Sequence, residues 1–441
     1  MRSYEEDVAE VIIEAAARAV WALRIEIVTV GFLTALWLIT DRAHGSTAAW
    51  SAVATVIAVV VVIGPIRRRT ARLFQHARIR RQWGRAVRAA QIACLQERIP
   101  TARRMRDIPA GERFHVRMPP GSSVPDLERS AEVIAAALGI RELRVRRNPA
   151  NASRAEVVIA RRDPLAGDTP MPWPESESPQ LSLWRPIPVG IGEDGQVVTV
   201  SLSERNQLLG GEPGAGKSVA LSLLVAGAAL DPNCKLWLLD GKLVELATWN
   251  RCADGCAGVS VADAIEVLHG LQVEMDRRYA QLLDAGRRKV AEGDGLPLHV
   301  VVCDELAHYL TTSDRKERTE FADLLRDLVS RGRAAGVIVL AATQKPSSDV
   351  IPTSIRDLFG FRWAMRCSTP QASDTILGSG WASAGYSAAE IDPACRGVGY
   401  LLHEGGIPVR LRSYHLDDAA LGHIAARAEA LRGLRTKPRE Y

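Results

Sequence analysis

The stretch QLLGGEPGAGKS at residues 207–218 decides the fold of the C-terminal part of the chain. Gly211 is followed by four residues and then by Gly216, Lys217 and Ser218, which is the P-loop pattern. Such glycines let backbone N–H groups turn inward around phosphates, and a helix starting at Lys217 adds its positive end. The pattern predicts an ATP-binding loop. The residues expected to contact the nucleotide are Gly211, Glu212, Pro213, Gly214, Ala215, Gly216, Lys217, Ser218 and Val219.

A pair of carboxylates ends the apolar stretch VVVCDE at residues 300–305. A carboxylate at the end of a hydrophobic strand is placed to hold magnesium, so Asp304 and Ser218 are the predicted Mg²⁺ ligands. The adjacent Glu305 is placed to orient and polarise the attacking water. Lys217 is expected to neutralise charge at the β- and γ-phosphates. The Asp-Glu pair favours hydrolysis over simple nucleotide binding.

Two more polar residues are candidates for catalysis. Gln344 ends the next apolar strand, GVIVLAATQ, where its side chain is placed to sense the γ-phosphate. Arg333, in VSRGRAAG, is placed to reach the phosphate bound by a neighbouring subunit and to stabilise transition-state charge. Arg331 shares that motif, and Arg356 is a reserve candidate. The alternative is that these are ordinary surface arginines.

The strands around these motifs predict an α/β fold. CKLWLLDGK, LPLHVVVCDE and GVIVLAATQKP are continuous apolar strands that alternate with long helical stretches. Such strands are typical of a parallel sheet covered by helices on both faces. We expect a P-loop, RecA-like motor domain over residues 188–416, followed by a tail at 417–441. The 441 residues, 47% of them hydrophobic, suffice for two or three domains.

Two apolar runs near the N-terminus predict a transmembrane hairpin at residues 25–66. The runs are IVTVGFLTALWLIT (27–40) and AAWSAVATVIAVVVVIGPI (48–66), and the second approaches the length needed to cross a bilayer. Arg67, Arg68 and Arg69 follow the hairpin and would keep the C-terminal part in the cytoplasm. Residues 1–24 are expected to form a short cytoplasmic helix. The alternative is a buried helical hairpin in a soluble core.

The segment at 67–110 is strongly basic, with thirteen arginines and one acid between residues 67 and 106, although the whole chain has a net charge of only +5. It predicts an orientation signal beside acidic lipid head groups or a second contact for DNA. A small α/β module is expected at 111–162, with a helix near 126–138 and strands at ELRVRR and AEVVIA, and a proline-rich linker at 163–187. The seven scattered cysteines fit a reducing compartment.

The motifs of residues 111–416 resemble those of the FtsK/SpoIIIE DNA translocases. The matching stretches are GEPGAGKSV, LLDGKLVEL, VVCDELA, LVSRGRAAGVIVLAATQKPSSDVI and GFRWAMRCSTPQASDTILG. The resemblance implies a membrane-anchored, hexameric motor that uses ATP and Mg²⁺ to move double-stranded DNA. Residues 356–387 are most similar to the actinobacterial conjugative-element branch, whose members transfer plasmid or integrated-element DNA.

The chain also departs from the family pattern. Ala372, Asp374 and Gly378 replace residues typical of the cell-division members. About 25 residues follow Leu416, too few for the winged helix with which many relatives read DNA sequence, so that reading is expected to be weak, absent or supplied by another protein. Two alternatives stay open: a protein-export ATPase like those of type VII secretion, and a coupling protein for single-stranded DNA.

Overall fold

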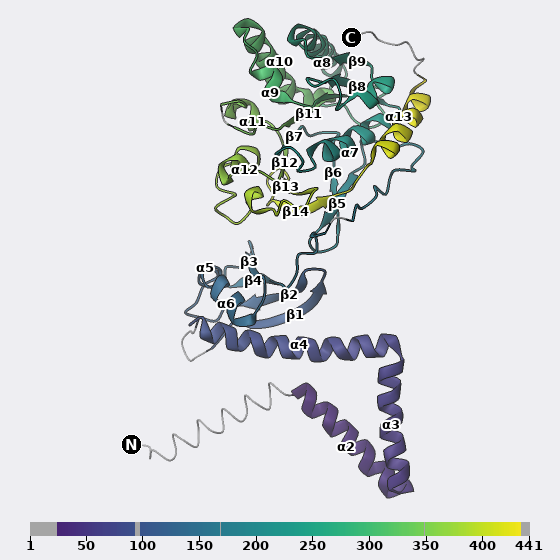
Figure 1. The fold of residues 1–441 in the computed structure, drawn as a ribbon, viewed down its shortest axis with the longest axis vertical. Helices are drawn as coiled ribbons and strands as arrows, with labels where there is room; N and C mark the ends of the chain where they lie inside the picture. The colour runs from purple at the N-terminus through teal and green to yellow at the C-terminus, as the bar shows by residue number, and fades with distance from the viewer. Residues whose placement is uncertain (1–23, 93–97, 168, 348, 434–441) are drawn as a thin grey trace. The chain divides into compact units, whose positions relative to one another are not determined.

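The computed structural model describes residues 24–92, 98–167, 169–347 and 349–433. The chain divides into two compact units, Met1–Asp163 and Pro164–Tyr441 (Figure 1). The helix expected at residues 1–24 lies almost entirely outside the described residues, as does the end of the C-terminal tail.

The first unit begins with three helices: α2 (Arg24–His44), α3 (Ser46–Val62) and α4 (Gly64–Ala89). The second apolar run was expected to extend to residue 66, but α3 ends at Val62 because Ile63 is extended and Pro65 opens α4. Among the described helices, no single one is long and apolar enough to cross a membrane. The pair α3 and α4, which bends by 93° at Ile63, meets the length and composition test together.

The apolar side chains of α2 and α3 are largely exposed. Val28 and Ile39 are each 69% exposed on α2, and Val62 is 78% exposed at the end of α3. The two helices pack against each other, with Trp37 and Trp50 in ring contact. In the part of the chain that the structure describes, no core covers most of the apolar side chains of this hairpin.

A four-stranded antiparallel sheet completes the first unit, in the order β1-β2-β4-β3. Its strands are β1 (Thr101–Ile108), β2 (Gly111–Arg117), β3 (Glu142–Arg147) and β4 (Arg154–Ala160). The single helix expected near residues 126–138 is instead two helices, α5 (Val124–Arg129) and α6 (Ala131–Leu138), which are separated by Ser130. Because β1 pairs with β2, the sheet begins ten residues before the expected boundary at 111.

One face of this sheet packs against α4 and α6. Trp83 of α4 meets Phe114 of β2 edge to face, with ring centroids 5.0 Å apart. Ile134 of α6 and Val157 of β4 are fully buried in the same core. The basic segment expected at 67–110 is therefore not separate from the module, since α4 and β1 both belong to it.

The described part of the second unit contains a ten-stranded sheet, in the order β6-β5-β14-β13-β12-β7-β11-β10-β8-β9. Its strands are β5 (Ile187–Gly192), β6 (Val197–Val200), β7 (Gln207–Gly210), β8 (Cys234–Leu239), β9 (Gly255–Ala257), β10 (Leu298–Cys303), β11 (Val337–Thr343), β12 (Phe361–Met365), β13 (Val398–Leu402) and β14 (Val409–Ser413). The strands from β12 to β9 are parallel. The other four pair antiparallel, so the predicted all-parallel sheet is wrong: the sheet is mixed.

Helices cover both faces of the parallel part (Figure 1). The helices α7 (Lys217–Ala229) and α13 (Asp418–Arg432) and the 3-10 helix η2 (Ala247–Cys252) pack on one face. The helices α8 (Val261–Asp284), α9 (Leu306–Leu310), α10 (Arg315–Ala335) and α11 (Thr353–Arg356) pack on the other. The helix α12 (Pro370–Leu377) and the 3-10 helix η3 (Ala388–Glu390) lie beside β12 and β13. Strands that are apolar along their whole length require helices on both faces of the sheet.

Both segments that flank the predicted motor domain pack into the core of the second unit. Trp173, in the segment expected to be a linker, is 1% exposed and donates a hydrogen bond from Nε1 to the carbonyl of Pro188, 2.8 Å away. Ile424 and Ala428, in the segment expected to be a tail, are buried on α13. The motor unit therefore begins before 188 and continues through Arg432, because both segments supply apolar side chains that the sheet face needs.

Candidate nucleotide-binding site

The P-loop connects the central strand β7 to the N-terminus of α7. Gly216 caps α7 in a left-handed conformation, with φ at +104°, and Gly214 has φ at +77°. A Cβ at Gly216 would meet backbone atoms of Gly397 at 2.9 Å, so only glycine fits. Gly397 in turn donates its N–H to the carbonyl of Ala215. The loop conformation is thus held from the side of β13.

Strand β12 holds the other end of the loop. The N–H of Glu212 donates to the carbonyl of Arg366 over 2.9 Å, and the Arg366 guanidinium lies 2.8 Å from the Glu212 carboxylate. Both contacts fix the backbone of residues 211–213 before the chain turns into the glycine-rich part. The loop is therefore arranged before a nucleotide binds, which reduces the ordering cost of binding.

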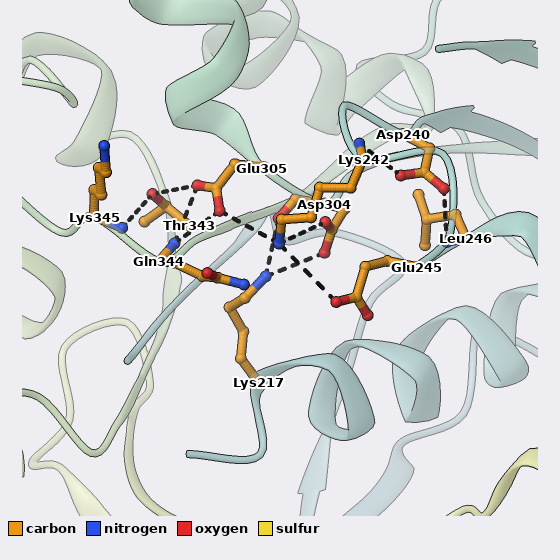
Figure 2. Close-up of polar contacts among 10 residues, drawn as sticks. All are labelled: Lys217, Asp240, Lys242, Glu245, Leu246, Asp304, Glu305, Thr343, Gln344 and Lys345. Atoms are coloured by element: carbon orange, nitrogen blue, oxygen red, sulfur yellow. Dashed lines mark hydrogen bonds and ion pairs between the residues drawn. The ribbon is translucent and has the colours of Figure 1, made fainter. Parts of the chain in front are cut away.

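Lys217 and Asp304 form a buried ion pair in the centre of the site (Figure 2). Lys217 Nζ lies 3.1 Å from both the Oδ1 atom and the carbonyl oxygen of Asp304, and the two side chains are 3% and 0% exposed. Asp304 directly follows β10, next to β11, and the P-loop follows β7 on the other side of β11. The parallel order of these strands brings the P-loop lysine and the predicted magnesium ligand together.

Glu305 is held by the end of β11. Its Oε1 atom accepts a hydrogen bond from the Thr343 hydroxyl, 2.9 Å away, and its carboxylate accepts the Gln344 N–H at 3.1 Å and 3.2 Å. Gln344, expected to act through its side chain, thus also positions Glu305 through its backbone (Figure 2). Thr343 was missed by the sequence analysis, although its place directly before Gln344 was a usable signal.

Lys242 also belongs to the site, and sequence reasoning assigned it no role. Its Nζ atom lies 3.3 Å from Asp304 Oδ2 and 3.6 Å from Glu305 Oε2. Burial lowers the pKa of Lys242, but the charges of Asp304 and Glu305 outweigh that effect and raise its pKa above the ordinary value. A signal was present, because the chain has seven lysines against forty-nine arginines and this one lies in the stretch LLDGKLVEL.

The loop that carries Lys242 is shaped by Asp240, which directly follows β8. The Asp240 carboxylate accepts the N–H of Lys242 at 3.1 Å and the N–H of Leu246 at 2.9 Å. Leu243 has φ at +65°, a conformation rarely adopted outside glycine. The loop thus directs the Lys242 ammonium toward the carboxylates of Asp304 and Glu305. Val244, in the same loop, is 73% exposed to solvent.

Arg333 does not join these residues within one chain. Its side chain is 47% exposed, and its guanidinium lies 3.5 Å from Glu404 and 3.7 Å from Glu204. Arg331 pairs instead with Asp276 and Asp327. The reserve candidate Arg356 is 8% exposed and contacts its neighbour Asp357 at 3.4 Å. A catalytic role for Arg333 therefore requires the phosphates of another copy of the chain.

The residues present fit MgATP. Asp304 Oδ2 is buried and accepts no hydrogen bond from the described residues, although the Lys242 ammonium faces it at 3.3 Å, and Ser218 is the second residue of α7, beside Lys217. A carboxylate and a hydroxyl are oxygen ligands of the kind that Mg²⁺ takes beside nucleotide phosphates. Ser218 and Asp304 would hold the ion, and the left-handed glycines leave room for phosphates against the backbone.

Comparison with known proteins finds a family match within the second unit. Residues 176–298, which include the P-loop and β8, match the FtsK/SpoIIIE family. This part of the chain is a P-loop ATPase segment of the FtsK/SpoIIIE type. The match includes the site residues as far as Lys242, and Asp304, Glu305 and Thr343 follow it in the chain.

Curated relatives in this family are DNA translocases named FtsK. The chain is 33% identical to the protein of Lactiplantibacillus plantarum over 218 residues, which are 44% of this chain and 27% of that protein. It is 28% identical to the protein of Lactococcus lactis subsp. cremoris over 291 residues, which are 61% of this chain and 38% of that protein. The chain therefore matches about a quarter to two fifths of the length of these FtsK proteins.

Solved structures support the fold. The conjugation coupling protein TcpA of pCW3, solved as a monomer with ATPγS, has a TM-score of 0.54 at 18% identity, covering 80% of this chain and 99% of that one. EssC of Geobacillus thermodenitrificans, comprising ATPases 2 and 3, has a TM-score of 0.50 at 14% identity, covering 60% of this chain and 52% of that one. At these identities the likenesses concern the fold alone.

Proposed function

We propose that this chain is a membrane-anchored, ATP-driven translocase of double-stranded DNA. The observation that carries the proposal is the assembly of Lys217, Asp304 and Glu305 around the P-loop, in a motor whose curated relatives are DNA translocases. A protein that only bound nucleotide would not need Glu305 held by Thr343 and Gln344. The arrangement is suited to hydrolysis.

Each residue has a defined part in the proposed reaction. Lys217 would leave Asp304 for the β- and γ-phosphates when ATP binds. Ser218 and Asp304 would hold a Mg²⁺ ion, which would supply neutralisation of phosphate charge. Glu305 accepts a hydrogen bond from the attacking water and orients it toward the γ-phosphate. Arg333 of a neighbouring copy stabilises the charge that develops on the transferred phosphoryl group.

Hydrogen bonds connect the site to a candidate DNA-binding segment. The Thr343 hydroxyl donates to Glu305 and accepts the N–H of Lys345, 3.1 Å away. Lys345 opens segment 345–360, which we propose as one lining of the DNA channel. A change at Glu305 on hydrolysis is thereby passed to that segment through two hydrogen bonds. Contact with phosphates would make DNA binding independent of sequence and sensitive to salt.

The proposed setting is conjugative transfer of a plasmid or integrative element in actinobacteria. The exposed apolar faces of α2 and α3 support a membrane anchor with the motor in the cytoplasm. The place of Arg333, away from its own P-loop, supports a homo-oligomer with nucleotide between subunits, which we propose to be a hexamer. A separate DNA-binding protein would supply any reading of sequence.

ATP hydrolysis by the detergent-solubilised full chain tests the proposal. Rates are measured without DNA, with duplex DNA and with single-stranded DNA, with Glu305→Gln as the inactive control. We expect strong stimulation by duplex and loss of turnover in the control. Stimulation by single strands alone would instead support a single-stranded DNA coupling protein. Turnover indifferent to both would support the protein-export alternative.

A further inference from the structure

The small sheet of the first unit has one face that no described helix of its own unit covers, and arginines dominate it. In β2 the side chains of Glu112, Phe114 and Val116 are buried, so Arg113, His115 and Arg117 point to the opposite face. Because paired residues of neighbouring strands point to the same face of a sheet, the register of β1, β3 and β4 against β2 identifies the other residues of this face. We call it the arginine face; its principal residues are Arg103, Arg106, Arg113, Arg117, Arg146 and Arg154.

The register places these arginines side by side. Arg106 of β1 is opposite Arg113 of β2, and Arg117 of β2 is opposite Arg154 of β4. In another row across the sheet, Arg103 of β1 is opposite His115 of β2, His115 is opposite Glu156 of β4, and Glu156 is opposite Arg146 of β3. Like charges opposite each other destabilise a sheet. Folding alone would not favour this arrangement, which therefore indicates a polyanionic partner.

Few acids offset this charge. Glu156, in the middle of the face, lies 3.8 Å from Arg113, and Glu142 at its edge pairs with Arg144. The other acids of the described strands are directed to the opposite face, where Asp107 contacts His76 of α4 and Glu112 contacts Gln75. The arginine face thus has a large local excess of positive charge.

The chemistry of the face favours a duplex backbone. With strands about 4.8 Å apart, four strands span about 14 Å, enough to contact several consecutive phosphates. The exposed side chains of this face, on the strands that the structure describes, include no phenylalanine, tyrosine or tryptophan. Proteins that hold single strands stack bases on such rings, whereas arginines without them bind phosphates and read no bases.

An acidic membrane surface is the competing polyanion, and the fold of the first unit argues against it. The helix α4 packs on the sheet face opposite the arginine face and follows directly from the apolar α3, at an angle of 93°. If α3 enters a bilayer, α4 lies along the bilayer surface. Its own exposed arginines, Arg78, Arg85 and Arg88, are then nearest the lipid, and the arginine face is directed away from it.

We infer that the arginine face binds the phosphate backbone of duplex DNA, as a second contact distinct from the motor channel. The inference rests on the proposed function, because the DNA it binds is the motor's cargo. Such a contact would hold DNA near the motor between hydrolysis steps. Since it neutralises phosphates, its affinity would fall steeply with salt.

Two charge-matched triple variants of the full chain test the inference. Arg117→Ala/Arg146→Ala/Arg154→Ala removes three charges from the arginine face, and Arg78→Ala/Arg85→Ala/Arg88→Ala removes three from α4. Binding of a labelled 60-base-pair duplex of random sequence is followed by anisotropy across a series of salt concentrations. We expect the face variant to bind at least about tenfold more weakly, with a slope of log K against log salt smaller by about 2 to 3. The α4 variant should bind as wild type does.

A lysine version of the face variant tests the role of charge, and a vesicle assay tests lipid binding. Arg117→Lys/Arg146→Lys/Arg154→Lys should recover most of the affinity if charge is what matters.

If the face variant loses binding to phosphatidylglycerol vesicles but keeps duplex affinity and slope, the face contacts lipid and the inference is wrong. If wild type is not stimulated by duplex at all, the proposed function itself fails. If wild type is stimulated and the face variant binds duplex equally well, only this inference fails.

Discussion

Lys242 and Lys217 share the two oxygens of one buried carboxylate. Lys217 Nζ lies 3.1 Å from Oδ1 of Asp304, and Lys242 Nζ lies 3.3 Å from Oδ2. In the nucleotide-free protein two ammonium groups therefore balance the charges of Asp304 and Glu305. When MgATP binds, that positive charge is no longer needed at Asp304. Lys242 is thus placed to respond to the metal.

Replacing Lys242 tests this charge balance. Lys242→Ala removes a cation that competes with the metal for Asp304, so we expect the nucleotide-free full chain to bind Mn²⁺ about three- to tenfold more tightly, corresponding to about 1 kcal/mol for a partly exposed ion pair. Electron paramagnetic resonance of free Mn²⁺ measures this directly. Lys235→Ala, at an exposed position on β8, is the control. Unchanged or weaker Mn²⁺ binding in the Lys242 variant would rule the competition out.

The Thr343 hydroxyl is expected to support turnover but not ATP binding. Thr343→Val keeps the shape of the side chain and removes the donor to Glu305, so kcat should fall about tenfold, as for loss of one hydrogen bond to a charged group. Thr343→Ser retains the hydroxyl and should stay near wild type. Steady-state hydrolysis and equilibrium ATPγS binding separate the two effects. A loss of binding with unchanged kcat would show that Thr343 shapes the pocket instead.

Gly216 should tolerate no side chain. Gly216→Ala combines a left-handed φ with a close approach to Gly397, and we expect ATPγS affinity to fall at least about a hundredfold, on the order of 3 kcal/mol. Gly270→Ala, in an open and exposed position on α8, should bind ATPγS normally. Titration of both variants with a fluorescent ATP analogue makes the comparison. Near-normal binding by Gly216→Ala would mean that the loop rearranges when nucleotide enters.

Mixing inactive variants tests whether Arg333 acts between subunits. Arg333→Ala and Lys217→Ala should each lose most activity alone, and a mixture should recover part of it, because some interfaces then pair an intact P-loop with an intact arginine. Arg331→Ala, whose side chain is engaged with Asp276 and Asp327, should retain activity. The measurement is DNA-stimulated hydrolysis across mixing ratios. A mixture no more active than its components would place Arg333 outside the reaction.

We expect His299 to make the folded second unit less stable in acid. Burial, with help from Arg278, lowers the pKa of His299 on β10 to about 3. Below about pH 6.5 the unfolded chain binds a proton that the folded chain excludes, so stability is present above that pH and is lost as the pH falls toward 3, by up to about 1.4 kcal/mol per unit. Local unfolding of β8 and β10 should therefore become easier between pH 7.5 and 5.

Replacing His299 by a residue that does not titrate isolates its contribution to the loss of stability in acid. Trp237 donates its ring N–H to Nδ1 of His299 over 3.2 Å, and His299→Asn keeps an acceptor nearby while removing the titration. The opening free energy of peptides covering β8 and β10, obtained from hydrogen exchange corrected for the intrinsic rate at each pH, should fall on acidification less in this variant than in wild type, by up to about 2 kcal/mol at pH 5. His415→Asn, at an exposed position, is the control. Equal acid sensitivity in all three proteins would exclude His299 as the cause.

The sequence predicted the nucleotide site better than its surroundings. Gly216, Lys217, Asp304 and Glu305 lie in short motifs whose spacing reflects the chemistry of phosphate and metal, and the structure brings the lysine and both carboxylates into one cluster. Lys242 was not assigned because its role depends on the fold: β8 must pair with β10 before the loop after β8 can reach Asp304. A linear motif carries no information about that pairing.

The errors in the fold have a similar cause. The strand β13 (VGYLL) is short and apolar like the parallel strands, so only its pairing with β12 and β14 shows that it runs antiparallel. Prolines in segment 163–187 suggested a free linker, yet Trp173 and Leu183 are buried because the sheet face beneath them needs a cover. The arginines of β1 were assigned to a juxtamembrane segment because their strand alternates poorly around the bulge between Arg103 and Arg106.

The burial of Trp173 has a mechanical consequence. The chain enters the motor unit at Pro164 and is held first by Leu165, which is buried in a core with residues of β12 and β13. The Trp173 ring and the bridge between Pro172 and His415 hold it next. Tension along the polypeptide from the first unit would therefore be borne first at β12 and β13, and then at β5 and β14, before it reached β7. Because Arg366 and Gly397, next to β12 and β13, hold the P-loop, a pull on the chain that enters this unit would be mechanically coupled to the nucleotide-binding loop.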